Sequence, residues 1–505
     1  MENWLWEAAC SIRGAMDAPK FKDYILPLVF LKRLSDVFDD EVSALSDQFG
    51  DAETAMKFVD KDHSLVRFFV PAEARWSSIR KLSSKIGEKL TDAIRAITKA
   101  NPSLQGVIDI VDYNQTTSGQ RIIDDNQLSS LIERLSDPRF RLGLRDVEPD
   151  FLGRAYEYLL RKFAEGQGQS AGEFFTPKEV GWLIAYLVNA KQGESVYDPA
   201  CGSGGLLIKC QLALKEKGEK ITKPLQLFGQ ERNHVTYAIA KMNMIIHDME
   251  GQIAIGDSLR NPKFSDNSSL KKFDIVVANP MWNQKGYGDI YDNDAYGRFD
   301  LAGPAPANNA DWGWIQHMAT ALDNSGRAAI VIDSGAVARG SGEKDKDRER
   351  EIRKKFVEND WIEGVILLPD NLFYNTPSPG IILLLNKNKK PERRNKILLI
   401  NASNTYEKGR PKNFIPMDKG LMLSEIFHSF TEVKNLSTVI TIDDAIKKDY
   451  NLSPSLFVGP DGDHEYHDII ALVNQIKEIQ LKNELLDQKL EEIVSKLGYK
   501  TETST

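Results

Sequence analysis

The sequence predicts an α/β protein built around a largely parallel sheet. From residue 173 to about 420, short apolar runs alternate with amphipathic segments, and the runs include LQLFG, DIVVA, AAIVI, GVILL and GIILLL. Nearly continuous apolar strands are typical of parallel sheets that helices cover on both faces. Two segments carry functional chemistry, SVYDPACGSGGLL at 195–207 and VVANPMW at 276–282. In each segment, polar or flexible residues follow an apolar run and so lie at the carboxyl end of a predicted strand. Binding sites in open α/β sheets form at these strand ends.

The regions on either side of this sheet have different patterns. Residues 1–165 show helical spacing of apolar residues, as in YILPLVFLKRLSDVFDDEV and AYEYLLRKFAE, so we expect an α-helical N-terminal domain. The polar, glycine-bearing stretch QGQSAG at 167–172 predicts a linker. We therefore expect the sheet domain over residues 166–420 and a C-terminal helical segment for subunit association over 421–505.

The segment 195–207 predicts a strand, a glycine-rich turn and the start of a helix. Gly202, Ser203 and Gly204 allow a ligand to approach backbone N–H groups at a helix N-terminus. The turn is neither a P-loop, because no Lys-Ser/Thr pair follows, nor a dinucleotide fingerprint, because the third glycine is missing. A tight turn that merely requires glycine is the structural alternative. Asp198, just before the turn, and the acids downstream favour a cofactor site.

Two further acidic residues end apolar runs. Glu231 lies in QLFGQERN, and Asp257 closes the run in IAIGDSL. A carboxylate at the end of the second strand of such a fold accepts hydrogen bonds from ribose hydroxyls, which makes Glu231 a candidate for that role. Asp257 is a candidate for contact with an adenine amino group. Each acid alone is typical of a solvated turn, but three acids at successive strand ends predict one cofactor site.

The second signature ends with Asn279, Pro280, Met281 and Trp282. It places an amide, two backbone carbonyls and a large aromatic ring at the carboxyl end of a strand. This combination predicts a pocket for a flat substrate that bears an amino group.

Together, DPACGSGGLL and NPMW make the chain resemble amino-group DNA methyltransferases that use S-adenosylmethionine. Four more segments follow the order found in the modification subunit of type I restriction–modification systems: GEFFTP at 172–177, RFDLAGPAPANNADWGWIQHM at 298–318, GRAAIVI at 326–332 and ILLPDNLFYNTPSPGIILLL at 366–385. The resemblance covers about residues 1–420 and implies a Rossmann-like methyltransferase domain. It implies that the cofactor is bound by Phe174, Thr176, Pro177, Asp198, Gly202, Ser203, Gly204, Glu231, Asp257 and Asn279.

The resemblance also implies the reaction, methylation of the exocyclic amino group (N6) of adenine in a specific DNA sequence. The side-chain oxygen of Asn279 and the backbone carbonyl of Pro280 would accept the amino hydrogens, and Trp282 would stack on a base flipped out of the duplex. This chemistry needs no metal and no nucleophilic cysteine, so Cys201 is interpreted as a small residue that fills space. The segment Phe373, Tyr374 and Asn375 is either a packed turn or part of the wall of the base pocket.

One residue departs from the family pattern. The family usually has a second proline at the position of Met281, and proline fixes φ. The departure leaves open a second hypothesis, a weak or inactive methyltransferase-fold scaffold that holds DNA within the complex. A third hypothesis, methylation of a protein glutamine through a similar Asn-Pro-Pro-Tyr loop, is disfavoured by the N-terminal domain and the C-terminal tail.

Composition limits the compartment and the partners. Lys and Arg total 65 and Asp and Glu total 73, so the net charge is 65 − 73 = −8. A domain that grips DNA alone is usually basic, so we expect a partner to supply much of the DNA affinity. The basic stretches 387–396 and 353–355 are interpreted as solvated surface. The 3 scattered cysteines and the absence of a signal peptide or a long apolar run predict a cytoplasmic protein without membrane contact.

The tail over residues 465–500 has a heptad pattern with one polar residue in the apolar seam. Such a seam indicates a two-stranded contact with another chain, the alternative being a helix packed on its own domain. The resemblance implies that the partner is the DNA-specificity subunit, with two copies of this chain flanking it and a restriction/translocase subunit as a further partner. The seam residues are Ile469, Leu472, Ile476, Ile479, Asn483, Leu486, Leu490, Ile493 and Leu497.

Overall fold

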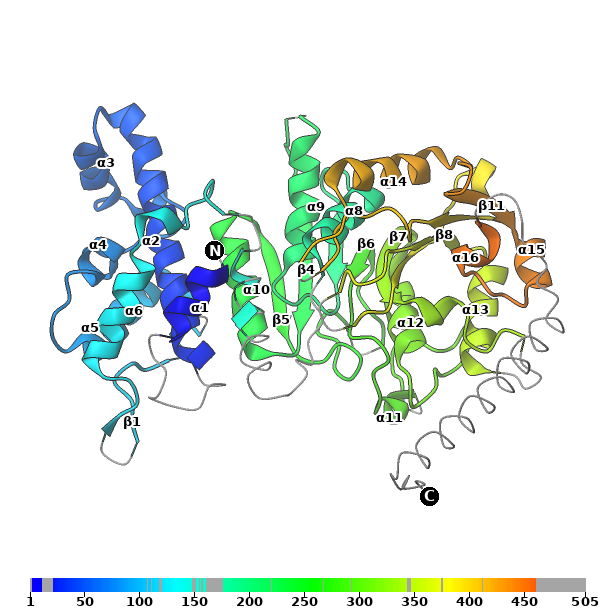
Figure 1. The fold of residues 1–505 in the computed structure, drawn as a ribbon, viewed down its shortest axis with the longest axis horizontal. Coiled ribbons are helices and arrows are strands. Elements are labelled where there is room, and N and C mark those ends of the chain that lie inside the picture. The colour runs from blue at the N-terminus through cyan, green and yellow to red at the C-terminus, as the bar shows by residue number, and fades with distance from the viewer. Residues whose placement is uncertain are drawn as a thin grey trace, which may run out of the picture. The chain divides into compact units, whose positions relative to one another are not determined.

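A nine-stranded mixed sheet forms the centre of the larger domain (Figure 1). The strands follow the order β11-β10-β8-β9-β7-β6-β3-β4-β5 within a compact unit that spans Met1–Val458. Their bounds are β3 (Ser195–Asp198), β4 (Gln226–Glu231), β5 (Gly251–Ile255), β6 (Phe273–Ala278), β7 (Leu322–Asp333), β8 (Ile362–Leu367), β9 (Gly380–Asn386), β10 (Lys396–Asn401) and β11 (Ser437–Thr441). The computed structural model describes residues 2–10, 21–106, 108–109, 111–117, 120–147, 151–153, 155, 158–159, 176–218, 220–266, 268–291, 293–342, 347–373, 376–410 and 412–459.

The half of the sheet made by β7, β6, β3, β4 and β5 is entirely parallel, as the sequence predicts. The central strands are buried on both faces, as in β6, where five of the six residues are buried, whereas only one of the five residues of the edge strand β5 is buried. After β5 the chain crosses back to β6, which pairs with the other side of β3. The strand order therefore reverses between β3 and β6, and such a reversal opens a crevice at the carboxyl ends of the strands.

The other half of the sheet is mixed, so the sheet as a whole is largely but not entirely parallel, in agreement with the expectation. The run GIILLL forms β9, which is antiparallel to both of its neighbours, β7 and β8. The described residues between β8 and β9 contain no helix, whereas a parallel return requires a crossover of a dozen or more residues, usually a helix. The edge strand β11 is also antiparallel to β10. An apolar run alone does not reveal strand direction.

Helices cover both faces of the sheet. In Figure 1, α8, α9 and α14 lie on one face and α12 and α13 on the other. Helix α8 is buried almost all round because it packs against α9, α14 and β7. The helices are α8 (Lys178–Val188), α9 (Gly205–Glu216), α10 (His234–Ile246), α11 (Gly288–Tyr291), α12 (Asp311–Ala321), α13 (Arg348–Glu358), α14 (Met417–Ser429), α15 (Ile442–Lys447) and α16 (Pro454–Phe457).

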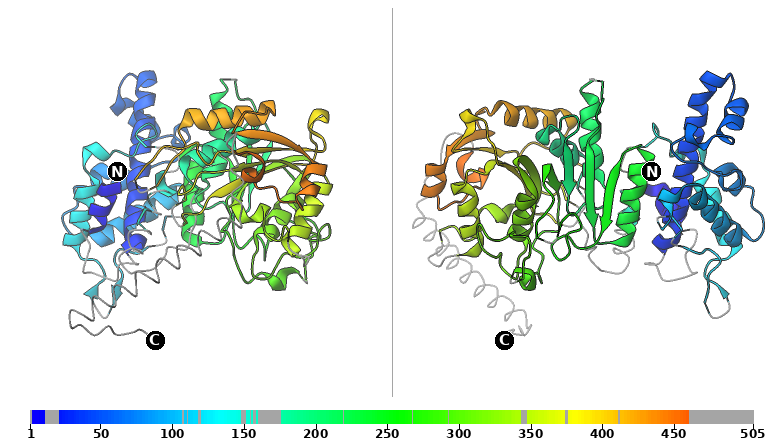
Figure 2. Two further views of the ribbon diagram at one scale, coloured as in Figure 1. Left: turned by 45° about the vertical axis from the view of Figure 1, so that its right-hand side comes forward. Right: turned by 180° about the vertical axis from the view of Figure 1, so that it is seen from behind.

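The N-terminal region forms helices with a core of their own (Figure 2). This agrees with the predicted helical domain, apart from a short hairpin of β1 (Thr116–Thr117) and β2 (Gln120–Arg121). The same core also includes residues of α10 from the sheet domain. The helices are α1 (Glu2–Cys10), α2 (Phe21–Phe49), α3 (Ala52–Val59), α4 (Trp76–Ile79), α5 (Ile86–Ala100) and α6 (Asp125–Leu135).

The expected boundary at residue 420 falls inside α14. Beyond it, β11 pairs with β10 and α16 packs on β10, so the sheet domain continues to Val458. Sequence patterning missed this because the short strand and helices after 420 carry no long periodic run. The predicted linker and the heptad tail lie outside the described residues. Within the described ranges, every helix is too short or too polar to span a bilayer.

Candidate functional site

Four predicted site residues lie side by side at the carboxyl edge of the parallel half-sheet. Adjacent parallel strands β6, β3, β4 and β5 end at or just before Asn279, Asp198, Glu231 and Asp257, in that spatial order. Residues separated by up to 81 positions in the sequence (279 − 198) are therefore neighbours along one edge. The three strand-end acids that the sequence singled out therefore lie along the same edge of the sheet.

The glycine turn connects β3 to α9 through two residues in the left-handed region. Gly202 has φ +53° and Gly204 has φ +80°. A side-chain carbon added at Gly202 would meet only Thr236 Cγ2 among the described atoms, at 4.0 Å, so a ligand can approach here. At Gly204 the added carbon would lie 3.0 Å from Met244 Cε and 3.6 Å from Ala240 Cβ. Gly204 is therefore favoured by its φ, and a side chain at this position would point towards α10.

Asp198 is 1% exposed at the end of β3, and its Oδ1 accepts the Ala200 N–H at 3.0 Å. Burial, together with the nearby charge of Glu231, raises the pKa of this carboxyl to about 8, although the Ala200 hydrogen bond lowers it. Next to it, Cys201 is buried, and burial raises its thiol pKa well above the usual value. A side-chain carbon at Gly229 would lie 2.9 Å from Cys201 Sγ, so Cys201 fills space against β4 as interpreted.

Glu231 faces the glycine turn. Its Oε2 accepts the Gly202 N–H at 3.0 Å, and its Oε1 accepts the Asn233 N–H at 2.7 Å. These two bonds fix the carboxylate at the end of β4, beside the open position at Gly202. A carboxylate can accept several hydrogen bonds, including bonds from hydroxyl groups.

Asp257 is fixed in the turn after β5. Its Oδ1 accepts the Leu259 N–H at 3.0 Å, and its Oδ2 accepts the Tyr287 hydroxyl at 2.9 Å. Arg232 lies 3.8 Å from the same carboxylate. Burial and the charge of Asp257 raise the pKa of Tyr287 to about 12. Sequence reasoning missed Tyr287, which lies in a loop with no motif to mark it.

The residues around the glycine turn fit a ligand with hydroxyl and charged groups. The hydroxyl oxygen of Thr236, in the first turn of α10, is buried and finds no hydrogen-bond partner among the described residues. Such orphaned buried groups are uncommon in folded proteins and are expected to be met by a ligand or by water. Helix α9 starts at the turn without a side-chain cap, and Ser203 is buried beside it. These features match the polar ribose and amino-acid parts of S-adenosylmethionine.

The second signature forms a clamped loop after β6. The Asn279 amide is 7% exposed; its Nδ2 donates to Thr176 Oγ1 at 3.1 Å, and its Oδ1 accepts the Trp282 indole N–H at 3.1 Å. The carbonyl of Pro280, a buried residue, accepts no hydrogen bond within the described part of the chain. Thr176 thus links the TP segment, which begins α8 after Pro177, to the NPMW loop. Phe174 lies outside the described residues.

Comparison with known proteins agrees with this geometry. A profile of the N-6 DNA methylase family matches residues 147–465, which include the whole nine-stranded sheet. The chain belongs to the N-6 DNA methylase family. A second profile, the HsdM N-terminal domain, matches residues 1–135 of the helical region.

The relatives of this methylase are subunits of type I restriction enzymes. It is similar to the MjaVIII methylase subunit of Methanocaldococcus jannaschii, with 35% identity over 92% of this chain and 80% of that protein. The HindI methylase subunit of Haemophilus influenzae is 30% identical over 85% of this chain and 100% of that protein. The crystal structure of a type I methyltransferase subunit from Streptococcus thermophilus superposes with a TM-score of 0.69 at 25% identity, covering 90% and 97% of the two chains. The chain is accordingly an adenine-specific DNA methyltransferase of the type I modification-subunit kind.

The NPMW loop of this methylase is supported by residues that sequence reasoning missed. Asp311, at the start of α12, accepts the Asn283 N–H at 2.8 Å and pairs with Arg339 at 2.6 Å. Trp314 Nε1 donates to Gln284 Oε1 at 2.8 Å. Both Asp311 and Trp314 belong to NNADWGW, a segment that we had used only for family resemblance. Because α12 holds the loop on its far side, the position of Asn279 depends on it.

The basic stretches of the methylase serve the fold. Lys389 is 4% exposed and lies 2.6 Å from Asp360, and Arg393 is buried 3.0 Å from Glu363. Arg353 is fully buried and donates to the backbone carbonyls of Tyr450, Ala336 and Arg339. The interpretation of these stretches as solvated surface is therefore wrong for these three side chains, which are also unavailable for DNA phosphates.

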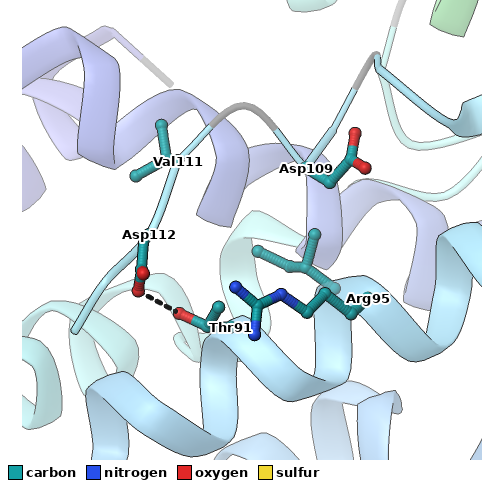
Figure 3. A pocket seen from close by; sticks show the side chains of 6 residues that line it. Thr91, Arg95, Asp109, Val111 and Asp112 are labelled. Atoms are coloured by element: carbon teal, nitrogen blue, oxygen red, sulfur yellow. Dashed lines mark hydrogen bonds between the residues drawn. The ribbon is translucent and has the colours of Figure 1, made fainter. Parts of the chain in front are cut away.

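A separate hollow lies in the helical domain (Figure 3). It has a volume of about 130 Å³, below the roughly 300–1,000 Å³ of typical small-molecule pockets. The Thr91 hydroxyl and Asp112 close one side with a 3.2 Å hydrogen bond. The hollow is too small for a nucleoside cofactor. It is lined by Thr91, Ile94, Arg95, Asp109, Val111 and Asp112.

The buried Asp198 carboxyl predicts a pH dependence of stability. Its pKa is about 8 in the folded chain against an ordinary value of 3.8, so the folded state binds more protons between these values. The free energy of unfolding should therefore fall as pH rises through this window. Asp198→Asn cannot ionise and keeps an acceptor for Ala200. Its stability relative to wild type should increase by about 1 kcal/mol per pH unit from pH 5 to 7, measured by urea denaturation. Equal slopes for the two proteins would contradict this.

Proposed function

We propose that the chain methylates N6 of adenine through the NPMW loop, with S-adenosylmethionine bound along the carboxyl edge of β3, β4 and β5. The observation that carries the proposal is the linear order of Asn279, Asp198, Glu231 and Asp257 on adjacent parallel strands. This order places the three acids, which we assign to the cofactor, beside the Asn279 amide, which we assign to the substrate. When bound, the cofactor supplies an electrophilic methyl group on a sulfonium.

The cofactor-binding roles follow the order of the strands. Glu231, fixed beside the open position at Gly202, accepts bonds from the ribose hydroxyls. Asp257, oriented by Tyr287, accepts from the adenine amino group of the cofactor. Asp198 and the turn Gly202, Ser203 and Gly204 contact the amino-acid part, together with Phe174, Thr176 and Pro177. Asn279 closes this end of the cofactor site.

The target amino group is held by two acceptors. The lone pair of an exocyclic amino nitrogen is delocalised into the adenine ring, which makes the nitrogen a poor nucleophile. The Asn279 side-chain oxygen and the open Pro280 carbonyl accept its two hydrogens and favour a pyramidal nitrogen with an available lone pair. Positioning and desolvation then supply most of the rate. The proton that the nitrogen releases after methylation leaves to water.

Trp282 orients the Asn279 amide. An indole N–H only donates, so its 3.1 Å contact requires the oxygen of the amide, and not the nitrogen, to face Trp282. The ring is 6% exposed and packs against Phe373 at 4.8 Å between centroids. This burial leaves little ring surface for the base stacking that the family resemblance implies. We therefore assign Trp282 a positioning role in addition to any stacking.

The scaffold hypothesis receives less support from the site. Met281 replaces a proline, but the loop is fixed on both sides, by Thr176 through Asn279 and by Asp311 through Asn283. A non-catalytic scaffold has no need to keep an oriented amide beside an open carbonyl.

The partners we propose are DNA, the DNA-specificity subunit and the restriction/translocase subunit. Several relatives are named as methylase subunits of type I restriction enzymes. A solved structure on the assembly of a type I restriction–modification system has the same fold, with a TM-score of 0.55. We propose two copies of this chain per specificity subunit, joined through the heptad tail.

The direct test combines the chain, its specificity subunit, labelled S-adenosylmethionine and DNA. Mass spectrometry of the digested nucleosides should find the label in N6-methyladenine. Asn279→Ala should reduce the rate at least 100-fold while the Kd of the cofactor changes less than threefold, because the amide acts on the target base. Label in another base, in protein, or at a wild-type rate in Asn279→Ala would refute the proposal.

Trp282→Phe keeps an aromatic ring and removes the indole N–H. We expect kcat to fall about tenfold with the Kd of cofactor and DNA unchanged, since one oriented hydrogen bond is lost. The fluorescence of 2-aminopurine at the target position, which reports base flipping, should stay at the wild-type level. Trp361→Phe, remote from the loop, is the matched control. An unchanged kcat with weaker flipping would indicate that Trp282 acts by stacking alone.

The tail is tested by deleting residues 465–505. Isolated helices are marginal in water, so an apolar seam of this length requires a partner surface. Each buried Leu or Ile contact that is lost costs about 2–5 kcal/mol. Cofactor binding should persist, while sedimentation should show no complex with the specificity subunit. A truncated chain that assembles with native affinity would show that the seam packs on its own domain.

A further inference from the structure

Lys209 is a buried cation in the second turn of α9. Only 6% of its surface is exposed, although lysine is rarely buried unless it is paired. The other two buried lysines in the described ranges, Lys32 and Lys389, each pair with a carboxylate, Asp36 and Asp360. Lys209 makes no ion pair with any residue that the structure describes, and its Nζ reaches only the Gly205 carbonyl, at 3.5 Å. Among the described residues its charge thus has no counter-charge.

The ammonium group lies between the first turns of two helices. Gly205 begins α9 directly after the glycine turn, and Gly181 lies in the first turn of α8, directly after the Thr176–Pro177 segment. A side-chain carbon at Gly181 would be 2.9 Å from Lys209 Cδ and 3.5 Å from its Nζ. The absence of a side chain at Gly181 therefore makes the space that Lys209 occupies. Both flanking segments border the proposed cofactor site.

The buried acid at the end of β3 does not neutralise this charge. Asp198 is buried at the end of β3, where its oxygen accepts the Ala200 N–H, and it forms no ion pair with Lys209. The α9 N-terminus adds to the positive character of the region, because it has no side-chain cap and its helix dipole favours an anion. A buried ammonium beside an uncapped helix start is a site for a carboxylate.

We propose that Lys209 pairs with the carboxylate of the amino-acid tail of the cofactor. This inference rests on the proposed function. It assigns to Lys209 the recognition of the amino-acid part of the cofactor, whereas other residues bind the nucleoside part. Ribose and adenine are held by carboxylates at β4 and β5, so the cation and the acids bind opposite ends of the ligand. Lys209 thereby distinguishes ligands that carry the amino-acid tail from those that lack it.

Two ligands separate the role of Lys209 from general folding. S-adenosylhomocysteine carries the carboxylate, and 5′-methylthioadenosine keeps the nucleoside and the sulfur but lacks the amino-acid tail. Calorimetry on Lys209→Met should show binding of S-adenosylhomocysteine at least tenfold weaker, with the Kd of 5′-methylthioadenosine within twofold of wild type. Lys215→Met, on the exposed last turn of α9, is the matched control and should alter neither Kd.

The outcomes are distinguishable. Equal Kd values for S-adenosylhomocysteine in wild type and Lys209→Met, or an equal loss for both ligands, would overturn the role of Lys209 and leave the proposed function intact. Failure of the wild-type chain to bind either ligand would refute the proposed cofactor site itself. If Lys209→Met does not fold, Lys209→Gln gives the same comparison. An independent comparison uses the wild-type chain and the carboxamide of S-adenosylhomocysteine. The carboxamide should bind at least tenfold more weakly than S-adenosylhomocysteine.

Discussion

The parallel pairing of β6, β3, β4 and β5 is the constraint on which the site depends. Since these strands point the same way, the loops that follow them open on one edge, and Asn279, Asp198, Glu231 and Asp257 become neighbours. One antiparallel strand among the four would move its end residue to the opposite edge. The antiparallel strands β9 and β11 lie in the other half of the sheet. They affect packing there but do not change the positions of the four strand-end residues. The direction of the strands therefore decides whether these four side chains can form one site.

Polar groups at this edge are buried, and their desolvation is offset by specific bonds. Asp311 is fully buried, but it pairs with Arg339 and accepts the Asn283 N–H. The opposite side of the loop is held by the Thr176 hydroxyl through Asn279. Unpaired burial of such groups costs several kcal/mol, so this network resists displacement of the loop. It provides the rigidity that a second proline at the position of Met281 would otherwise provide.

Several basic side chains of the chain are used inside the fold. Lys389, Arg393 and Arg353 lie in ion pairs or donate to backbone carbonyls, and the net charge of the whole chain is −8. Phosphate contacts supply most of the affinity of DNA-binding proteins and need exposed cations. This distribution is consistent with a subunit that catalyses the reaction while a partner supplies much of the affinity for DNA. Lys209 differs from these residues, because it is buried and has no acidic partner in the part of the chain that the structure describes.

The sequence by itself determined the chemistry and the class of fold. The apolar runs gave the strands, and the residues that ended them, Asp198, Glu231, Asp257 and Asn279, were identifiable because a polar residue after a buried strand is conspicuous. Strand direction, the end of the domain at Val458, and the roles of Tyr287, Asp311 and Lys209 were decided only by the tertiary structure. The reason is physical: periodicity records which face of an element is buried, while direction, register and side-chain partners depend on contacts between segments far apart in the chain. The same holds for the packing of α10 beside Gly204.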